Sequence, residues 1–227
     1  MRRRVLMLKL LHKIVGMDND RLTKQIFLWD WKHKGRTWSY NIRCMLRMAN
    51  VDINSDLESL DYSVVIKTVK EKLLEQEIVK WREDKDRQSK LRLYRQLKDS
   101  FCTELYISKN MSKSCRSFIA QLRSSTLPIN IEIGRFQQKA VENRICPCCN
   151  ENKIEDEIHF LFNCPLYAGT RIVFMQHVKI FYPDISTKSY TEQLQCFMND
   201  TNLICKLGAF IRDCYFIRNT YIYSVKK

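Results

Sequence analysis

Apolar side chains recur every three or four residues along most of the chain, which is the spacing of one face of an α-helix. In the first part of the chain this pattern predicts helices over residues 3–15, 21–34 and 37–49, with Gly16 and Gly35 as stop signals. The side chains expected to face inward are Val5, Leu8 and Leu11 (or Leu8, Leu11 and Val15), then Leu22, Ile26, Trp29 and His33, then Trp38, Ile42, Met45, Leu46 and Met48.

The middle of the chain has a longer and more polar pattern. A helical stretch is expected over residues 62–98, but residues 82–90 carry no apolar side chain. This polar segment can be a solvated piece of helix or a loop between two helices. A further helix is expected over residues 109–123, and residues 124–138 are expected to be irregular or briefly extended because a proline and a glycine interrupt them.

Three more helical patterns follow, over residues 165–182, 189–198 and 202–223, and the last is strongly apolar. The chain has only 5 Gly and 4 Pro, which disfavours an all-β fold rich in tight turns. We therefore expect a mainly α protein, with a helical bundle-like N-terminal part and a small module packed on C-terminal helices.

One short stretch has the spacing of a metal site. Cys146, Cys149, His159 and Cys164 follow the pattern C-x2-C-x9-H-x4-C within nineteen residues. Three thiolates and one imidazole can fill the tetrahedral shell of a structural Zn²⁺ ion and leave no open position for catalysis. The segment 155–163 is expected to be a short helix that directs the histidine back toward the cysteine turn.

Cys148 is a competitor for one ligand position. We prefer Cys149, because C-x2-C is the usual zinc turn and C-x-C is not. The remaining cysteines have no framework spacing and are expected to be reduced residues of an intracellular protein. These cysteines are Cys44, Cys102, Cys115, Cys196, Cys205 and Cys214.

The chain is strongly basic, with a net charge of +14. Residues 1–139 carry 29 Lys and Arg against 16 Asp and Glu, a net charge of +13, whereas residues 140–227 carry 10 against 9. A basic balance of this size favours a polyanionic partner such as nucleic acid, although a solvated lysine-rich surface has the same composition. The positive charge belongs to the N-terminal part rather than to the metal module.

Several basic side chains are placed to contact phosphates. The segment 80–98 holds eight Lys and Arg residues, partly offset by three acids. A basic approach to a zinc knuckle suits a nucleic-acid backbone. The candidate nucleic-acid-binding residues are Arg92, Arg95, Arg123, Arg135, Lys139, Arg144 and Arg171.

Signatures of catalysis are missing. The sequence has no adjacent Asp-Asp pair for two-metal chemistry, no glycine-rich phosphate loop and no H-E-x-x-H or G-x-S-x-G motif. We therefore expect no enzymatic activity, no catalytic residues and no small-molecule substrate.

Address signals are also weak. No run approaches the ~20 apolar residues that a membrane span needs. Lys9, His12 and Lys13 break the apolar run of the N-terminus, which disfavours a signal peptide. The arginines and the lack of acids there suit a mitochondrial presequence, but an ordinary basic amphipathic helix is favoured. We expect an intracellular protein without membrane contact, with the nucleus as one candidate compartment.

Several motifs together resemble one known arrangement. They are Ser89-Lys-Leu-Arg-Leu-Tyr94, Arg123, Ile131-Glu-Ile-Gly-Arg-Phe136, Arg144-x-Cys-x-x-Cys149, Glu155-Asp-Glu-Ile-His-Phe160, Cys164-Pro-Leu-Tyr167 and Arg171. This series resembles the C-terminal, zinc-binding region of non-LTR retrotransposon reverse transcriptases. The segment around Trp38 resembles, less specifically, the thumb and linker that precede that region, so the likeness covers roughly residues 20–175.

The resemblance implies a role in holding template RNA or target DNA during target-primed reverse transcription. The polymerase and endonuclease residues are absent, so the chain is expected to be a fragment of such a polyprotein. The implied segments are a thumb or linker-like part (1–60), a long basic helical linker (61–139) and a zinc-binding module with C-terminal helices (140–227). Two alternatives stay open: a protein-interaction module with a purely structural zinc site, and a product that does not fold without its upstream domains.

Overall fold

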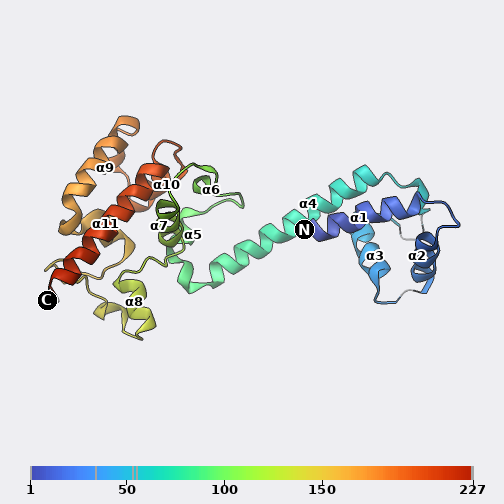
Figure 1. Cartoon of the computed structure of the whole chain (residues 1–227), viewed down its shortest axis with the longest axis horizontal. Coiled ribbons are helices and arrows are strands. Elements are labelled where there is room, and N and C mark those ends of the chain that lie inside the picture. The colour runs from blue at the N-terminus through green and yellow to red at the C-terminus, as the bar shows by residue number, and fades with distance from the viewer. Residues whose placement is uncertain (1, 34, 53, 55, 226–227) are drawn as a thin grey trace. The chain divides into compact units, whose positions relative to one another are not determined.

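A computed structural model describes residues 2–33, 35–52, 54 and 56–225 (Figure 1). The fold is mainly helical, as the sequence predicts, and in these residues the β pairing consists of a single antiparallel bridge between Ile145 and Ile154. The chain forms two compact units, Met1–Glu83 and Asp84–Lys227. None of the helices described is both long and apolar enough to cross a bilayer.

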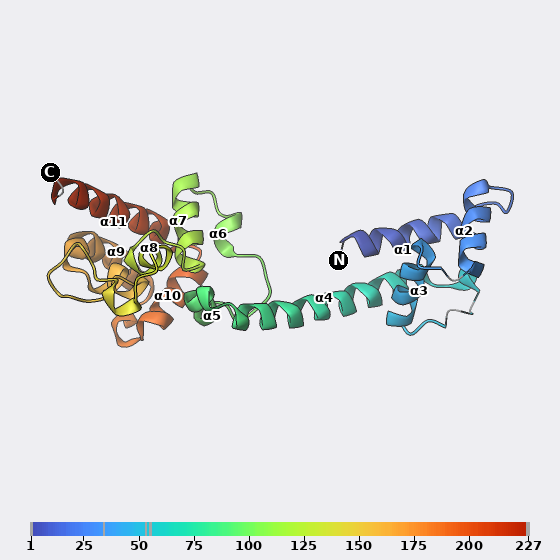
Figure 2. The same cartoon turned by 90° about the horizontal axis from the view of Figure 1, so that it is seen from below.

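The first unit is a small helical core (Figure 2). Its elements are α1 (Arg2–Val15), α2 (Leu22–His33), α3 (Trp38–Met48), the 3-10 turn Leu57–Ser59 and most of α4 (Tyr62–Arg87). Leu8, Leu11 and Ile42 are completely buried between these helices. The inward positions expected for α1 and for the middle of α3 are therefore confirmed.

Helix α2 turns a different face inward from the one predicted. Leu22 and Trp29 are 69% and 62% exposed, whereas Phe27 is 4% exposed and packs in the core. Lys24 lies on the same inner face, and its ammonium group donates to Glu58 Oε1 at 2.9 Å and to the Met17 carbonyl at 2.8 Å. A buried lysine is tolerated because both bonds compensate its lost hydration.

The second unit contains the remaining helices, which Figure 1 labels α5 to α11. They are α5 (Arg92–Leu97), α6 (Leu105–Ser108), α7 (Lys113–Arg123), α8 (Asn130–Phe136), α9 (Ala168–Phe181), α10 (Tyr190–Asn199) and α11 (Ile204–Val225). Helix α4 ends at Arg87, and α5 begins five residues later. The polar segment 82–90 therefore contains a break in the α-helix. The buried core draws on residues from both sides of position 139.

Helix α11 is the central element of this unit and packs against both α7 and α9 (Figure 1). Gly208 allows the close approach to α7, because a Cβ atom there would lie 2.9 Å from Cys115 Cβ and 3.0 Å from Ile119 Cδ1. On the α9 side, the rings of Phe174 and Phe210 stack in parallel with centroids 4.7 Å apart. The apolar last helix thus supplies the core, as its sequence indicates.

Residues 124–138 were expected to be irregular or extended, and this prediction is wrong for α8. The helix begins because a distant residue supplies its cap: the Glu155 carboxylate accepts from Asn130 N at 2.7 Å. The Glu155 carbonyl also accepts from Ile131 N at 3.0 Å. These bonds satisfy N–H groups that a helix start leaves without partners. Sequence periodicity does not show them, because the acceptor lies 25 residues away.

Candidate metal centre and its basic surroundings

The first pair of predicted ligands lies in a hairpin-like turn. Ile145 and Ile154 form the antiparallel bridge at its base, and Cys146 N donates to the Lys153 carbonyl at 2.9 Å. Asn152 adopts a positive φ of 51°, a conformation that asparagine accepts more readily than most residues. The turn therefore places Cys146 and Cys149 on one side of a closed loop.

The second pair flanks a single turn of π-helix, His159–Asn163: His159 is its first residue, and Cys164 directly follows its last. Asp156 starts this turn, because its carboxylate accepts from His159 N at 2.7 Å. Cys164 N then donates to the His159 carbonyl at 2.7 Å, which closes the wide turn. The expected helix over 155–163 is thus shorter and wider, and it carries both side chains toward the cysteine turn.

The four side chains meet at one point. The ligand atoms of Cys146, Cys149, His159 and Cys164 all lie within 4.8 Å of one another. Cys146 Sγ lies 4.0 Å from Cys164 Sγ, and Cys149 Sγ lies 3.4 Å from His159 Nε2. A tetrahedron with Zn–S of about 2.3 Å and Zn–N of about 2.0 Å has S···S edges of about 3.8 Å and S···N edges of about 3.5 Å. Both measured separations fit this geometry.

The cluster is enclosed rather than open. Cys146, Cys164 and His159 are at most 4% exposed, and only Cys149 is partly accessible. Hydrogen bonds from Cys148 and then Cys164 lower the pKa of Cys146, and the thiolate is the form of cysteine that binds metal. A buried shell of four protein ligands can hold a metal ion but offers no position for a substrate.

Cys148 belongs to a second group of potential ligands, together with Cys146 and Glu155. Both Glu155 oxygens are already engaged, since Arg218 donates to them at 2.7 and 2.8 Å. The pKa of the Cys148 thiol is raised, first because it donates a hydrogen bond to Cys146 and then because it is buried. The geometry therefore favours Cys149 as the fourth candidate ligand, because its sulfur lies with those of Cys146 and Cys164 and with His159, whereas Cys148 groups with the engaged Glu155.

Sequence reasoning missed the ion pair that joins this centre to the last helix. The side chain of Glu155 is 0% exposed and that of Arg218 is 5% exposed. Burial opposes the charge of Arg218, but the hydrogen bonds to Glu155 outweigh it and raise the arginine pKa. Glu155 also caps α8, so one carboxylate connects the metal loop, α8 and α11. No local signal marks such a pair, because its partners are 63 residues apart.

Two of the predicted phosphate-binding arginines donate to backbone carbonyls around the candidate metal centre. Arg144 donates to the Ile131 carbonyl at 2.8 Å and twice to the Lys139 carbonyl. Arg171 donates to the Leu161 carbonyl at 2.8 Å and to the carbonyl of the ligand Cys164 at 2.7 Å. Each guanidinium group therefore fixes backbone around the candidate centre.

Two further candidates are engaged in ion pairs. Arg123 is 4% exposed, and its Nη2 lies 2.8 Å from Glu104. Arg92 is partly exposed and donates at 2.6 Å to Glu157, whose side chain is 5% exposed. Burial raises the pKa of Glu157, and the neighbouring Arg92 opposes that rise. Both arginines connect elements of the unit to each other.

The remaining candidates have more accessible side chains. Arg135 and Lys139 are exposed, and Arg95 is partly exposed. The guanidinium of Arg135 makes two hydrogen bonds to Glu132, at 2.7 and 2.9 Å, and lies 4.5 Å from the ring centroid of Phe136.

Sequence reasoning also missed the accessible aromatic ring of Phe136, which is 72% exposed. Phe136 lines a cavity of about 300 Å³ together with Lys90, Pro128 and Glu132. An exposed ring beside exposed cations forms a surface with both apolar and positive character. We call Lys90, Arg135, Phe136 and Lys139 the α8 surface.

Comparisons with protein-family models, curated proteins and solved structures found no match for this chain. The likeness to the zinc-binding region of non-LTR reverse transcriptases therefore rests on the motif residues alone and stays a prediction.

Proposed function

We propose that the second unit is a zinc-stabilised module that binds single-stranded nucleic acid through the α8 surface. Zn²⁺ is the metal that best suits three thiolates and one imidazole at the observed separations. Its role is structural, because it joins the cysteine turn to the π-helical turn. By joining these two turns, the metal also fixes the backbone that carries the basic side chains next to the centre.

The observation that carries the nucleic-acid proposal is the exposed Phe136 ring with Arg135 beside it. A base can stack on such a ring, and each base–aromatic stack contributes about 1–3 kcal/mol without strong sequence preference. Lys90, Arg135 and Lys139 supply cations for the phosphates on either side. The same surface is consistent with the RNA- or DNA-holding role that the resemblance implies.

The test is binding of a short labelled single strand to the zinc-loaded chain across a salt series. Three phosphate contacts predict a slope of about −2 for log affinity against log salt. Phe136→Ala should weaken binding by about 1–3 kcal/mol and leave this slope unchanged. Arg135→Glu with Lys139→Glu should reduce both the affinity and the slope.

The matched control is Lys179→Glu with Lys188→Glu, which changes the same charge at two exposed lysines elsewhere in the unit. Arg144 is a poor test residue, because its side chain holds the metal loop. Equal losses of affinity in the control and in the α8 variants would mean that net charge, and not the α8 surface, accounts for the binding. Binding that ignores salt and Phe136 would contradict the proposal.

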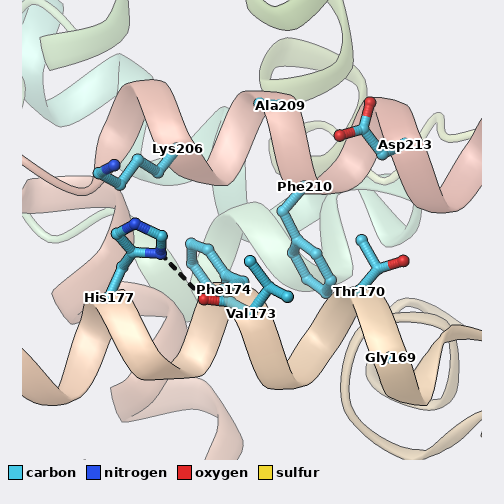
Figure 3. A pocket seen from close by; sticks show the side chains of 9 residues that line it. All are labelled: Gly169, Thr170, Val173, Phe174, His177, Lys206, Ala209, Phe210 and Asp213. Carbon is cyan, nitrogen blue, oxygen red and sulfur yellow. Dashed lines mark hydrogen bonds between the residues drawn. The ribbon is translucent and has the colours of Figure 1, made fainter.

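A second candidate function is protein interaction with a structural zinc site, and one observation favours it. A mostly apolar cavity of about 420 Å³ lies between α9 and α11 (Figure 3). Val173, Phe174 and Phe210 line it, with His177 and Lys206 toward one end and Asp213 toward the other (Figure 3). Gly169→Leu would fill this cavity, since no heavy atom lies within 4 Å of the position of its Cβ. Nucleic-acid binding that persists in this variant would separate the two functions.

A further inference from the structure

The cavity between α9 and α11 has the size and the lining of a small-molecule site (Figure 3). Its volume is about 420 Å³, and such sites commonly measure about 300–1,000 Å³, with apolar walls and a few polar groups. Val173, Phe174 and Phe210 occupy its middle, whereas the charged side chains lie only toward its two ends (Figure 3). A matching ligand is therefore apolar along its body and charged at an end.

Two aromatic rings give the cavity a fixed floor. Phe174 and Phe210 are both buried, and their stacked rings are almost parallel, with 2° between the planes. Phe197 makes a further edge contact with Phe174, with the ring centroids 5.2 Å apart. Gly169 contributes no side chain, so the space above these rings stays open on the α9 side. A floor that is already in place spares a ligand the cost of ordering it.

One end of the cavity is positive. The Lys206 side chain is exposed, and no acid in the described part of the chain pairs with its ammonium group. His177 lies at the same end, where its Nδ1 donates to the Val173 carbonyl at 2.9 Å. Its other ring nitrogen lies on the side of Lys206 (Figure 3). An anionic group of a ligand would gain at this end a cation that no protein group already neutralises.

The other end disfavours a second anion. Asp213 follows Lys206 by seven residues on α11, which places the two about 10 Å apart along the helix axis. The Asp213 carboxylate already pairs with Arg212 at 2.8 Å, so it does not depend on a cation from a ligand. A second carboxylate on a ligand would lie beside Asp213, and like charges in contact oppose binding. The two ends together select a monoanion.

We propose that this cavity binds a small amphipathic monocarboxylate, with its carboxylate at Lys206 and its hydrocarbon chain over the rings of Phe174 and Phe210. Burial of the chain supplies most of the affinity, since each buried methylene adds about fourfold. The carboxylate adds about two- to fivefold, as an exposed ion pair does, and sets the direction of the chain. This site is separate from the metal centre and from the α8 surface. A protein segment in the same cavity is the alternative that the experiment separates.

The experiment titrates octanoate into the full, zinc-loaded chain and follows the valine methyl groups by NMR. The Val173 signals should shift and saturate, whereas those of Val64 in the first unit should not, although the two side chains are 56% and 57% exposed. Hexanoate, which lacks two methylenes, should bind roughly tenfold more weakly. Octanedioate should also bind more weakly than octanoate. Equal shifts at both valines, no saturation at Val173, or tighter binding of octanedioate would overturn the proposal.

Two variants test the position of the ligand, and circular dichroism checks that each folds. Gly169→Leu fills the cavity and should weaken octanoate by roughly tenfold or more, with little risk to the fold because no heavy atom lies within 4 Å of the added Cβ. Lys206→Gln should weaken octanoate by about two- to fivefold and leave binding of neutral octan-1-ol unchanged. Lys179→Gln is the matched control, an exposed lysine of α9 outside the lining. Octanoate binding that survives Gly169→Leu, or equal losses in the two lysine variants, would overturn the proposal and leave the cavity to a protein partner.

Discussion

Removing the guanidinium of Arg218 should destabilise the second unit more than any surface change of equal charge. In Arg218→Met the Glu155 carboxylate keeps its bond from Asn130 N but loses both charge-assisted bonds. Breaking one side of a buried ion pair costs about 3–5 kcal/mol, because the remaining charge stays out of water. For a unit of about 150 residues this lowers the unfolding midpoint by roughly 10 °C.

The matched control lies on the same helix. Arg212 also pairs with an acid, Asp213, at 2.8 Å, but the two side chains are 44% and 48% exposed. An exposed pair contributes about 0–1 kcal/mol, so Arg212→Met should move the midpoint by no more than a few degrees.

Two optical signals separate the units in this assay. All four tryptophans lie in the first unit, so their fluorescence should keep its wild-type transition in both variants. The tryptophans are Trp29, Trp31, Trp38 and Trp81. Far-ultraviolet circular dichroism of the zinc-loaded chain should show the lower unfolding midpoint of the second unit in Arg218→Met. Equal midpoints for Arg218→Met and Arg212→Met would refute the reasoning about the buried pair.

Two further predictions concern packing and titration. Gly208→Ala should lower the free energy of unfolding by about 1–3 kcal/mol, because its Cβ would overlap Cys115 and Ile119. Urea unfolding measures this change. A gain in stability would contradict the prediction and mean that α7 and α11 can move apart at no cost. Burial, with a smaller effect of the Asp56 charge, raises the pKa of Tyr62 to about 12. The first unit should therefore keep this stabilisation below the unfolded value of about 10 and lose it as pH rises through about 12. Tyr62→Phe should remove one late-titrating group from the ultraviolet absorbance curve, and an unchanged curve would contradict this.

Local periodicity was enough to predict most helices, because their apolar faces follow the helical repeat. It was misleading in α2, where two faces carry apolar side chains. The face that turns inward carries Phe27, which packs against Trp31 and Trp38, and Lys24, whose ammonium group donates to Glu58 and Met17. Which face of a helix turns inward depends on contacts between helices and cannot be read from the sequence of one helix alone.

The cluster of four ligands could be predicted because each pair lies on its own tight turn and the spacing limits the geometry. The backbone contacts of Arg144 and Arg171 could not be predicted. In the sequence these residues look like any solvated arginine, because the carbonyls that accept from them are brought near only by the folded turns. Phe136 was missed as a surface residue for a similar reason, since the N-terminus of helix α8 is capped by Glu155, 25 residues away.

The most direct test of the account is metal analysis of the purified chain, followed by replacement of the bound metal with Co²⁺. We predict one metal ion per chain and a cobalt spectrum with thiolate charge-transfer and tetrahedral ligand-field bands. Cys148→Ser should retain this spectrum, whereas Cys149→Ser should lose metal affinity. A folded chain that binds no metal, or one in which Cys148 rather than Cys149 is required, would contradict the centre described above.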